Sequence, residues 1–204
     1  MMTRNELTGL VVCGGASSRM GRDKSLLTYH DREQRYHIAD MLSHFCKEVY
    51  LSLNEMQTIS STSYKAFTDL PEYRDCGPIA ALLTAYHFLP EHNLVVVGCD
   101  YPLLTHGELE GFIKSLSNDT TSCAFYNEED GFYEPLLAYY AASMARVVKV
   151  NFEYENTSLQ HILKESGTER YIPKDKNGIK SVDDPVGYEQ VKEWIKQNRD
   201  GNRY

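Results

Sequence analysis

A run of four apolar residues, LVVV at positions 94–97, constrains the fold of this chain more than any other feature of its sequence. An uninterrupted β-branched run is typical of a strand that is buried on both faces of a parallel sheet. Both faces of such a strand must be covered by apolar residues, so helices are needed on either side of the sheet. The run therefore predicts the centre of a sheet that lies between two helical layers.

Alternating strand-like and helix-like segments extend this prediction to the rest of the chain. Apolar residues recur at helical spacing over residues 36–45, and an apolar helix is predicted between Gly77-Pro78 and Pro90. Strand patterns occur at residues 10–13, 49–53, 64–67, 121–126 and 132–140. The last two of these segments are candidates for antiparallel pairing. The alternation predicts a three-layer α/β/α fold with a mostly parallel central sheet.

Local signals predict where several later elements begin. Thr105 with Glu108 matches the capping box that starts a helix. Thr157 with Gln160 matches a second capping box. Asn177-Gly178 is a hairpin turn signal, and Asp184-Pro185 can cap and open the last helix.

Composition favours a single cytoplasmic domain. No repeat, low-complexity tract or linker divides the sequence, so residues 1–204 are predicted to form one domain. A net charge of −8 argues against a general binder of nucleic acid or anionic membranes, which needs a basic face. The five cysteines are widely spaced without a CxxC pair, which favours reduced thiols. No segment resembles a signal peptide or a membrane span, and we therefore expect a cytoplasmic protein.

A glycine-rich segment, GGASSRMGRDK at positions 14–24, directly follows the first predicted strand. Its glycines, which include Gly14 and Gly15, let the backbone approach a ligand closely and direct N–H groups toward it. Arg19, Arg22 and Lys24 add three cations to a chain that is acidic overall. Backbone N–H groups with fixed cations suit a polyphosphate, and the alternative is a surface turn with incidental basic residues. The spacing matches neither the Walker A loop nor the Rossmann fingerprint.

Asp100 follows the 94–97 strand, and ligands of open α/β sheets gather outside the carboxyl ends of the strands. A carboxylate at that position can hold Mg²⁺, which prefers oxygen ligands and often bridges protein to phosphate. The alternative is that Asp100 caps a turn beside Pro102. The neighbouring Cys99 has no evident base and is expected to pack.

Three further positions are candidates for the same site. Asn54 and Asp69 each close a predicted strand and can contact a base or a ribose, with an ordinary turn role as the equal alternative. Gly77-Pro78 opens a predicted helix whose N–H groups can meet an anion or a base edge.

Taken together, these motifs resemble those of the molybdenum cofactor guanylyltransferases, the MobA-type nucleotidyltransferases. CGGASSRMGRDKSLL at positions 13–27 is similar to their nucleotide-binding loop LAGGxSxRMGxDK, with Val12-Cys13 in place of Leu-Ala. The other similar segments follow in the family's order. Asp69 stands where the family has an aspartate that closes strand three, and residues 77–81 resemble its GPLAG stretch. Residues 98–102 resemble its PCDTP motif, residues 134–136 its HP segment and residues 181–185 its NVNTP segment.

The resemblance implies a Rossmann-like nucleotidyltransferase fold and an enzyme that transfers GMP from GTP to the terminal phosphate of molybdopterin, with pyrophosphate leaving and Mg²⁺ as cofactor. The N-terminal half would bind the nucleotide and the C-terminal half the acceptor. Arg19 and Lys24 would stabilise the departing pyrophosphate, and Asp100 would bind the GTP-linked Mg²⁺. The residues implied to form the nucleotide site are Val12, Cys13, Gly14, Gly15, Lys24, Asn54, Asp69, Gly77, Pro78 and Asp100. Implied partners are GTP, molybdopterin and, transiently, molybdoenzymes or other cofactor-biosynthesis proteins.

The chain also departs from the family's pattern. Ser52 and Ser181 stand where the family often has asparagine, and Asp183-Asp184 replaces its Asn-Thr. The last of these positions face the acceptor, where two added carboxylates repel an anion unless cations such as Lys174, Lys176 or Lys180 neutralise them. The alternatives are a cytidylyltransferase or a sugar-phosphate nucleotidyltransferase of the same fold, or a non-catalytic nucleotide-binding accessory protein of molybdoenzyme maturation.

Overall fold

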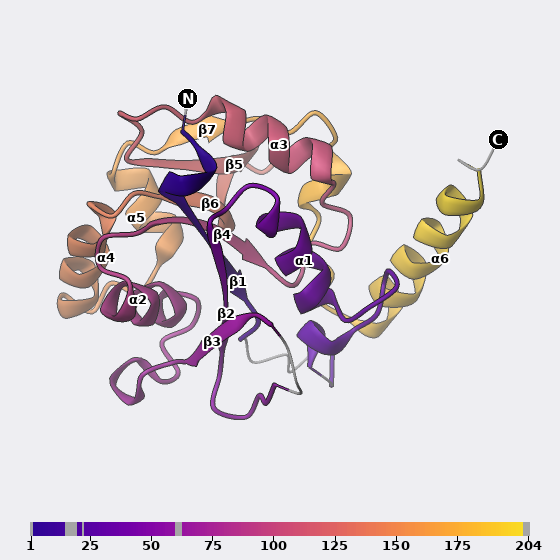
Figure 1. The fold of residues 1–204 in the computed structure, drawn as a ribbon, viewed down its shortest axis with the longest axis horizontal. Helices are drawn as coiled ribbons and strands as arrows, with labels where there is room; N and C mark the ends of the chain where they lie inside the picture. The colour runs from indigo at the N-terminus through magenta and orange to yellow at the C-terminus, as the bar shows by residue number, and fades with distance from the viewer. Residues whose placement is uncertain (1, 15–19, 22, 60–62, 202–204) are drawn as a thin grey trace.

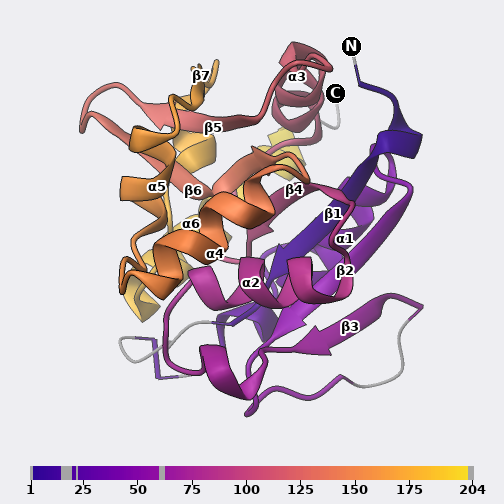
Figure 2. The same cartoon turned by 90° about the vertical axis from the view of Figure 1, so that its left-hand side faces the viewer.

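The computed structural model describes residues 2–14, 20–21, 23–59 and 63–201, and within them a seven-stranded sheet lies between layers of helices (Figures 1 and 2). Its strands are β1 (Leu7–Val12), β2 (Glu48–Leu53), β3 (Lys65–Thr68), β4 (Asn93–Gly98), β5 (Ser122–Asn127), β6 (Phe132–Tyr140) and β7 (Glu169–Tyr171). They lie in the order β3-β2-β1-β4-β6-β5-β7. β6 runs antiparallel to both of its neighbours, whereas the other paired strands are parallel.

β4 is covered on both faces, as the 94–97 run predicts. Val95 and Val97 pack on the side of α1 (Gln34–Ser43) and α3 (His106–Ser115). Leu94 and Val96 pack on the opposite side, against the layer formed by α2 (Ile79–Phe88), α4 (Met144–Glu153) and α5 (Leu159–Glu165). All four side chains are at most 1% exposed. The predicted three-layer α/β/α fold is therefore confirmed, and Figure 1 shows the two helical layers on either side of the sheet.

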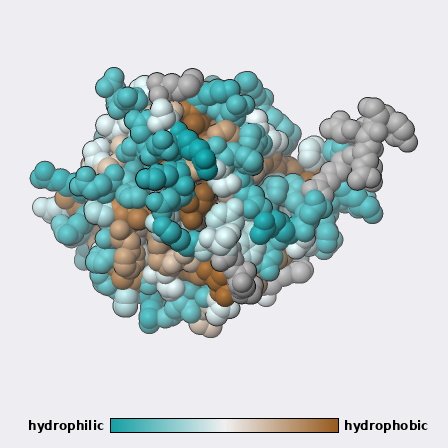
Figure 3. Space-filling model, in the orientation of Figure 1, coloured by the Kyte–Doolittle hydropathy of each residue, from teal (hydrophilic) through white to brown (hydrophobic). Residues whose placement is uncertain are grey.

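The last helix, α6 (Pro185–Gly201), extends beyond the body of the protein (Figure 1). Asp184 caps it as predicted, because the Asp184 Oδ1 atom accepts a hydrogen bond from the Gly187 N–H at 2.9 Å. Hydrophilic residues dominate the face shown in Figure 3, where apolar residues form only small patches. Within the described ranges, no helix combines the length and the apolar character needed to cross a membrane.

The two predicted capping boxes have different outcomes. Thr105 caps α3, since its Oγ1 atom accepts from the Glu108 N–H at 3.2 Å. The reciprocal half of the box is not formed, because the Glu108 carboxylate accepts from Tyr171 Oη and the Lys174 N–H instead. The prediction at Thr157 is wrong, because Ser158 caps α5. The Gln160 side chain, which the motif would direct to the helix start, bonds to the backbone of Tyr133 in β6 instead.

The hairpin predicted at Asn177-Gly178 is also wrong. These residues belong to a 3₁₀ turn, η4 (Lys176–Ile179), in which Asp175 accepts from the Asn177 N–H at 2.9 Å. The turn buries Ile179 in the core on the α3 side of the sheet. Tertiary burial of one apolar side chain therefore decides the conformation of this segment over the local turn preference.

Close packing of α1 on β1 yields a prediction about stability. A Cβ atom on Gly9 would lie 3.2 Å from Leu42 Cβ and 3.1 Å from Val49 Cγ2. We expect Gly9→Ala to lower the free energy of unfolding by about 1–3 kcal/mol, measured by urea denaturation, because overpacking displaces α1. Gly107→Ala on α3 is the matched control: its added Cβ meets nothing within 4 Å. Alanine is the better helix former there, so equal losses in both variants would contradict the packing argument.

Candidate functional site

The carboxyl ends of four parallel strands gather most of the predicted site residues at one edge of the sheet. Gly14 follows β1, Asn54 follows β2, Asp69 follows β3 and Asp100 follows β4. Because these strands are neighbours in the order β3-β2-β1-β4, the four residues follow one another along the edge. A Cβ atom on Gly14 would lie 3.6 Å from the Asn54 nitrogen and 3.9 Å from Asp69 Oδ2. The structure therefore brings Gly14, Asn54 and Asp69 together.

Asp69 is held at this edge as a largely desolvated carboxyl group. Its backbone N–H donates to the Leu53 carbonyl at 2.9 Å, which continues the β2–β3 pairing. In the part of the chain that the structure describes, its buried Oδ1 atom has no hydrogen-bond partner. Burial raises the pKa of Asp69 to about 6, and the Ser52 hydroxyl only partly offsets this shift. Such a group is ready to accept a hydrogen bond from a ligand hydroxyl or amine.

Asp100 is the second carboxyl group with an unsatisfied oxygen. The absence of a side chain at Gly98 leaves space for it, since a Cβ atom there would lie 2.5 Å from Asp100 Oδ1. That Oδ1 atom is buried and has no partner among the described residues. Burial, with a contribution from the charge of Asp183, raises the pKa of Asp100 to about 6, and Lys24 acts in the opposite direction.

The donor set at Asp100 fits a hard divalent cation. Mg²⁺ is usually held by one or two carboxylates, with water and substrate phosphates as its remaining ligands. Asp100 supplies the orphaned carboxylate oxygen, and Asp183 lies close enough to affect its charge state. No group of three or more His, Cys, Asp or Glu side chains suited to a metal occurs within the described ranges.

A long-range ion pair joins the glycine-rich segment to the C-terminal segment beside Asp100. Lys24 lies in the short turn η2 (Lys24–Leu26), and its Nζ atom is 2.5 Å from Asp183 Oδ1. The Val182 N–H donates to the Asp100 carbonyl at 2.8 Å, which fixes the C-terminal segment against the end of β4. The cation that pairs with Asp183 is thus Lys24, whereas Lys176 pairs with Glu129.

Glu134 of β6 is a site residue that sequence reasoning named only as part of a motif. Tyr101 Oη donates to Glu134 Oε2 at 2.8 Å. Burial raises the pKa of Glu134 to about 7, with contributions from the charges of Asp100 and Asp130. Glu134 also lines a cavity of about 360 Å³, together with Asn127, Glu129, Asp130, Phe132, Lys176, Ile179, Lys180 and Ser181. No sequence signal indicated this cavity, because its walls come from separate parts of the C-terminal half.

The remaining predicted residues have varied positions. Val12 ends β1, and Cys13 is buried with its Sγ atom 3.8 Å from that of Cys99, so Cys99 packs as expected. Gly77, at a φ of +73°, and Pro78 lie at the N-terminus of α2. Their roles as nucleotide ligands stay predictions. Gly15 and Arg19, together with Arg22, lie outside the described residues.

Comparison with known proteins relates this site to one family. A family model described as the MobA-like NTP transferase domain matches residues 9–170. A probable molybdenum cofactor guanylyltransferase from Carboxydothermus hydrogenoformans is 32% identical over 149 residues, which cover 70% of each chain. A molybdenum cofactor biosynthesis bifunctional protein from Synechocystis is 30% identical over 139 residues, which cover 68% of this chain and 40% of that relative. The match thus covers less than half of the length of the bifunctional relative.

A solved structure agrees with the sequence comparisons at the level of the fold. The molybdopterin-guanine dinucleotide biosynthesis protein A from Archaeoglobus fulgidus superposes with a TM-score of 0.76. The match covers 93% of this chain and 99% of that protein, at 18% sequence identity. At this identity, the likeness establishes a shared nucleotidyltransferase fold.

The raised pKa of Asp100 predicts a pH-dependent cost to stability. The folded protein binds this proton more tightly than the unfolded chain does, so ionisation destabilises the fold increasingly as the pH rises from about 4 to about 6. Without divalent cations, we expect Asp100→Asn to be more stable than the unmodified protein at pH 8 by about 2–3 kcal/mol, and by less than about 1 kcal/mol at pH 4. Asp119→Asn, in an exposed loop, is the control. A pH-independent difference in urea denaturation would refute this explanation.

Proposed function

The chain belongs to the MobA-like NTP transferase family, and on this premise we propose that it transfers GMP from GTP to the terminal phosphate of molybdopterin and releases pyrophosphate. One observation carries the proposal. The unpartnered Oδ1 atom of Asp100 lies at the same sheet edge as the Gly14–Asn54–Asp69 group and the Lys24–Asp183 pair. The same edge therefore has carboxylate oxygens that can bind a cation and a lysine that can bind phosphate. Beside them lies a glycine that permits close approach of a nucleotide.

The nucleoside would lie toward β2 and β3. Gly14 lies against Asn54 and Asp69, close enough for a Cβ atom to contact both, and the Asp69 carboxylate can accept hydrogen bonds from ribose hydroxyls or from a base. The Gly14-Gly15 and Gly77-Pro78 pairs are closer to the guanine form of the family than to the AAG form of the related cytidylyltransferases. These features support GTP as the nucleotide.

The triphosphate would lie toward β4, between Lys24 and Asp100. A bound Mg²⁺ would supply Lewis-acid chemistry and charge neutralisation for the phosphates. Asp100 and Asp183 are the carboxylates that would hold it, and Lys24 would exchange its contact with Asp183 for one with the phosphates. This exchange costs little, because both partners of the ion pair are partly exposed to solvent.

The reaction itself requires positioning and charge neutralisation. An oxygen of the acceptor phosphate forms a bond to the α-phosphorus, the bond from that phosphorus to the oxygen bridging to the β-phosphate breaks, and pyrophosphate leaves with the electron pair. The acceptor phosphate is already ionised at neutral pH, so no strong general base is needed. Lys24 and Arg19 would neutralise the charge that develops on the leaving group.

The acceptor would occupy the cavity of about 360 Å³ on the β6 side of Asp100. Its wall holds two lysines beside the carboxyl groups of Glu129, Asp130 and Glu134. Lys176 is paired with Glu129, so Lys180 is the lysine that would contact an anionic acceptor. Asn127, Glu134 and Ser181 supply hydrogen-bonding groups on its wall. The N-terminal half would thus bind the nucleotide and the C-terminal half the acceptor.

Nucleotide choice is testable by thermal unfolding with GTP, CTP, ATP and UTP, each with and without Mg²⁺. A ligand that binds only the folded state stabilises it by about 2.7 kcal/mol at a hundred times its Kd. We expect GTP with Mg²⁺ to raise the melting temperature most. A larger rise in melting temperature with CTP would indicate cytidylyl transfer instead of guanylyl transfer. Nucleotide binding without any pyrophosphate release would favour the accessory role.

Two variants test the proposed catalytic groups. We expect Asp100→Ala and Lys24→Met each to lower the rate of pyrophosphate release by about 10²–10³, as loss of one preorganised electrostatic contact typically does. Lys114→Met is the control, since Lys114 is exposed on α3 and pairs with Glu110. Unchanged rates in the two site variants, at saturating GTP and acceptor, would refute these assignments.

A further inference from the structure

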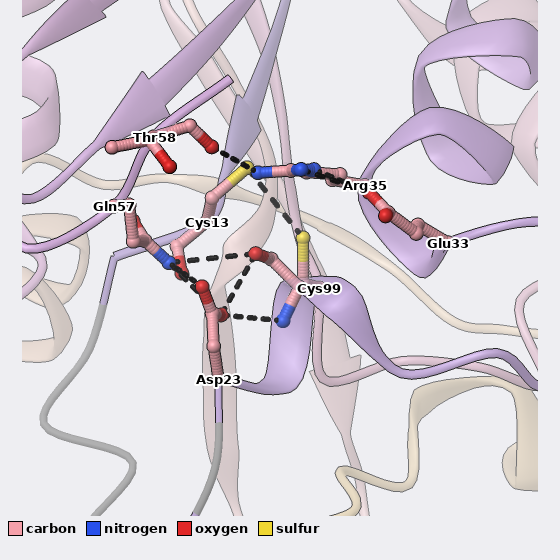
Figure 4. Close-up of polar contacts among 8 residues, drawn as sticks. Cys13, Asp23, Glu33, Arg35, Gln57, Thr58 and Cys99 are labelled. Carbon is pink, nitrogen blue, oxygen red and sulfur yellow. Dashed lines mark hydrogen bonds and ion pairs between the residues drawn. The ribbon is translucent and has the colours of Figure 1, made fainter. Parts of the chain in front are cut away.

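The side-chain amide of Gln57 lies between Cys13 and Asp23 (Figure 4). Its Nε2 atom donates to the Cys13 carbonyl at 2.9 Å and to the two carboxylate oxygens of Asp23 at 3.0 and 2.9 Å. Its Oε1 atom accepts from the Asn54 N–H at 2.9 Å. Cys13 and Asp23 flank residues 14–22 in the sequence, and Asn54 follows β2. One amide therefore ties both flanks of the glycine-rich segment to the neighbouring strand end.

The partners of Gln57 are themselves fixed. The adjacent residue, Thr58, accepts at its carbonyl from the Arg35 Nη1 atom at 3.0 Å. Arg35 is buried on α1 and pairs with Glu33 at 2.8 Å, so the chain around Gln57 is anchored to the core. Asp23 accepts from the Ser25 N–H at 2.9 Å and from the Ser25 hydroxyl at 2.8 Å.

These hydrogen bonds determine the direction in which the Gly14 N–H points. In a planar trans peptide, the carbonyl of one residue and the N–H of the next point to opposite sides. The Cys13 N–H is already bonded to the Ser52 carbonyl at 2.9 Å, and the Cys13 carbonyl is bonded to Gln57. With both ends of Cys13 held, the Gly14 N–H must point away from Gln57.

We propose that Gln57 is a positioning residue for nucleotide binding: it orients the Cys13–Gly14 peptide so that the Gly14 N–H faces the nucleotide, and it fixes Asn54 beside it. This inference rests on the proposed nucleotide-binding role of the same sheet edge. Only a primary amide of this length supplies two N–H donors, for Cys13 and Asp23, and an acceptor for Asn54.

The test compares Gln57→Met with Gln160→Met. Both replace an amide that bridges backbone groups by an apolar side chain of similar length. Gln160 joins α5 to Tyr133 of β6, with its Oε1 atom 3.0 Å from the Tyr133 nitrogen. We expect both variants to unfold at a lower temperature without ligand. Only Gln57→Met should raise the Kd of Mg²⁺–GTP, by about ten- to a hundredfold, because displacement of a binding group is costly even when the group itself is retained.

A second variant keeps the test informative if Gln57→Met folds poorly. Gln57→Glu preserves the acceptor for Asn54 but turns a carboxylate toward Asp23 and the Cys13 carbonyl. We expect a larger rise in Kd for this variant than for Gln57→Met. Equal nucleotide affinity in Gln57→Met, Gln57→Glu and Gln160→Met would overturn the inference.

The outcome also separates this inference from the proposed function. If the unmodified protein binds CTP instead of GTP, guanylyl transfer fails, and the comparison with CTP as probe still supports or overturns the role of Gln57. If the unmodified protein binds none of the four nucleotides, both proposals fail. If it binds GTP and the Gln57 variants bind it equally well, the proposed function stands and only the positioning role is lost.

Discussion

Burial of β1 and β4 on both faces is the constraint on which the rest of this structure depends. A strand that contacts helices on either side cannot turn one face to water. Long crossover connections between the parallel strands β1, β2 and β4 therefore place helices over both faces of the sheet. Leu94 to Val97 alternate between the two core layers as this requires. Parallel pairing of β3, β2, β1 and β4 then places four chain segments at the same edge, with their carboxyl ends side by side.

The same edge concentrates the features that oppose stability. Asp69 and Asp100 each keep a buried carboxylate oxygen that finds no partner in the described part of the chain, and burial raises the pKa of both groups. Carboxyl groups of this kind destabilise an empty protein at neutral pH and gain most from a cation or a hydrogen-bond donor that arrives with a ligand. Gly98 and Gly14 belong to the same arrangement, since a side chain at either would occupy space beside these carboxylates. Local conflicts that gather at one edge of an otherwise consistent fold are typical of a binding site.

Contacts between distant segments give this edge its shape. Lys24 and Asp183 meet although they lie far apart in the sequence, because the segment before α6 returns to β4 through the Val182–Asp100 backbone bond. Gln57 acts on the opposite side, where it connects the flanks of the glycine-rich segment to the end of β2. The Lys24 cation and the Gly14 N–H proposed for nucleotide binding are thus held from two directions, by the distant side chains of Asp183 and Gln57.

The sequence by itself determined six of the seven described strands, most helices, the cap at Thr105 and the position of Asp100 at the end of a buried strand, because these depend on periodicity and on hydrogen bonds within a few residues. It gave no signal for the short strand β7. Where a distant partner competes, the local signal fails. The Gln160 side chain bonds to the backbone of Tyr133 in β6 and does not form the predicted capping box. Instead of the predicted hairpin, Asn177-Gly178 forms a 3₁₀ turn that buries Ile179. The Lys24–Asp183 pair, the Glu134 cavity and the bonds of Gln57 were decided only by tertiary structure, since each joins residues that become neighbours only after the strands have paired.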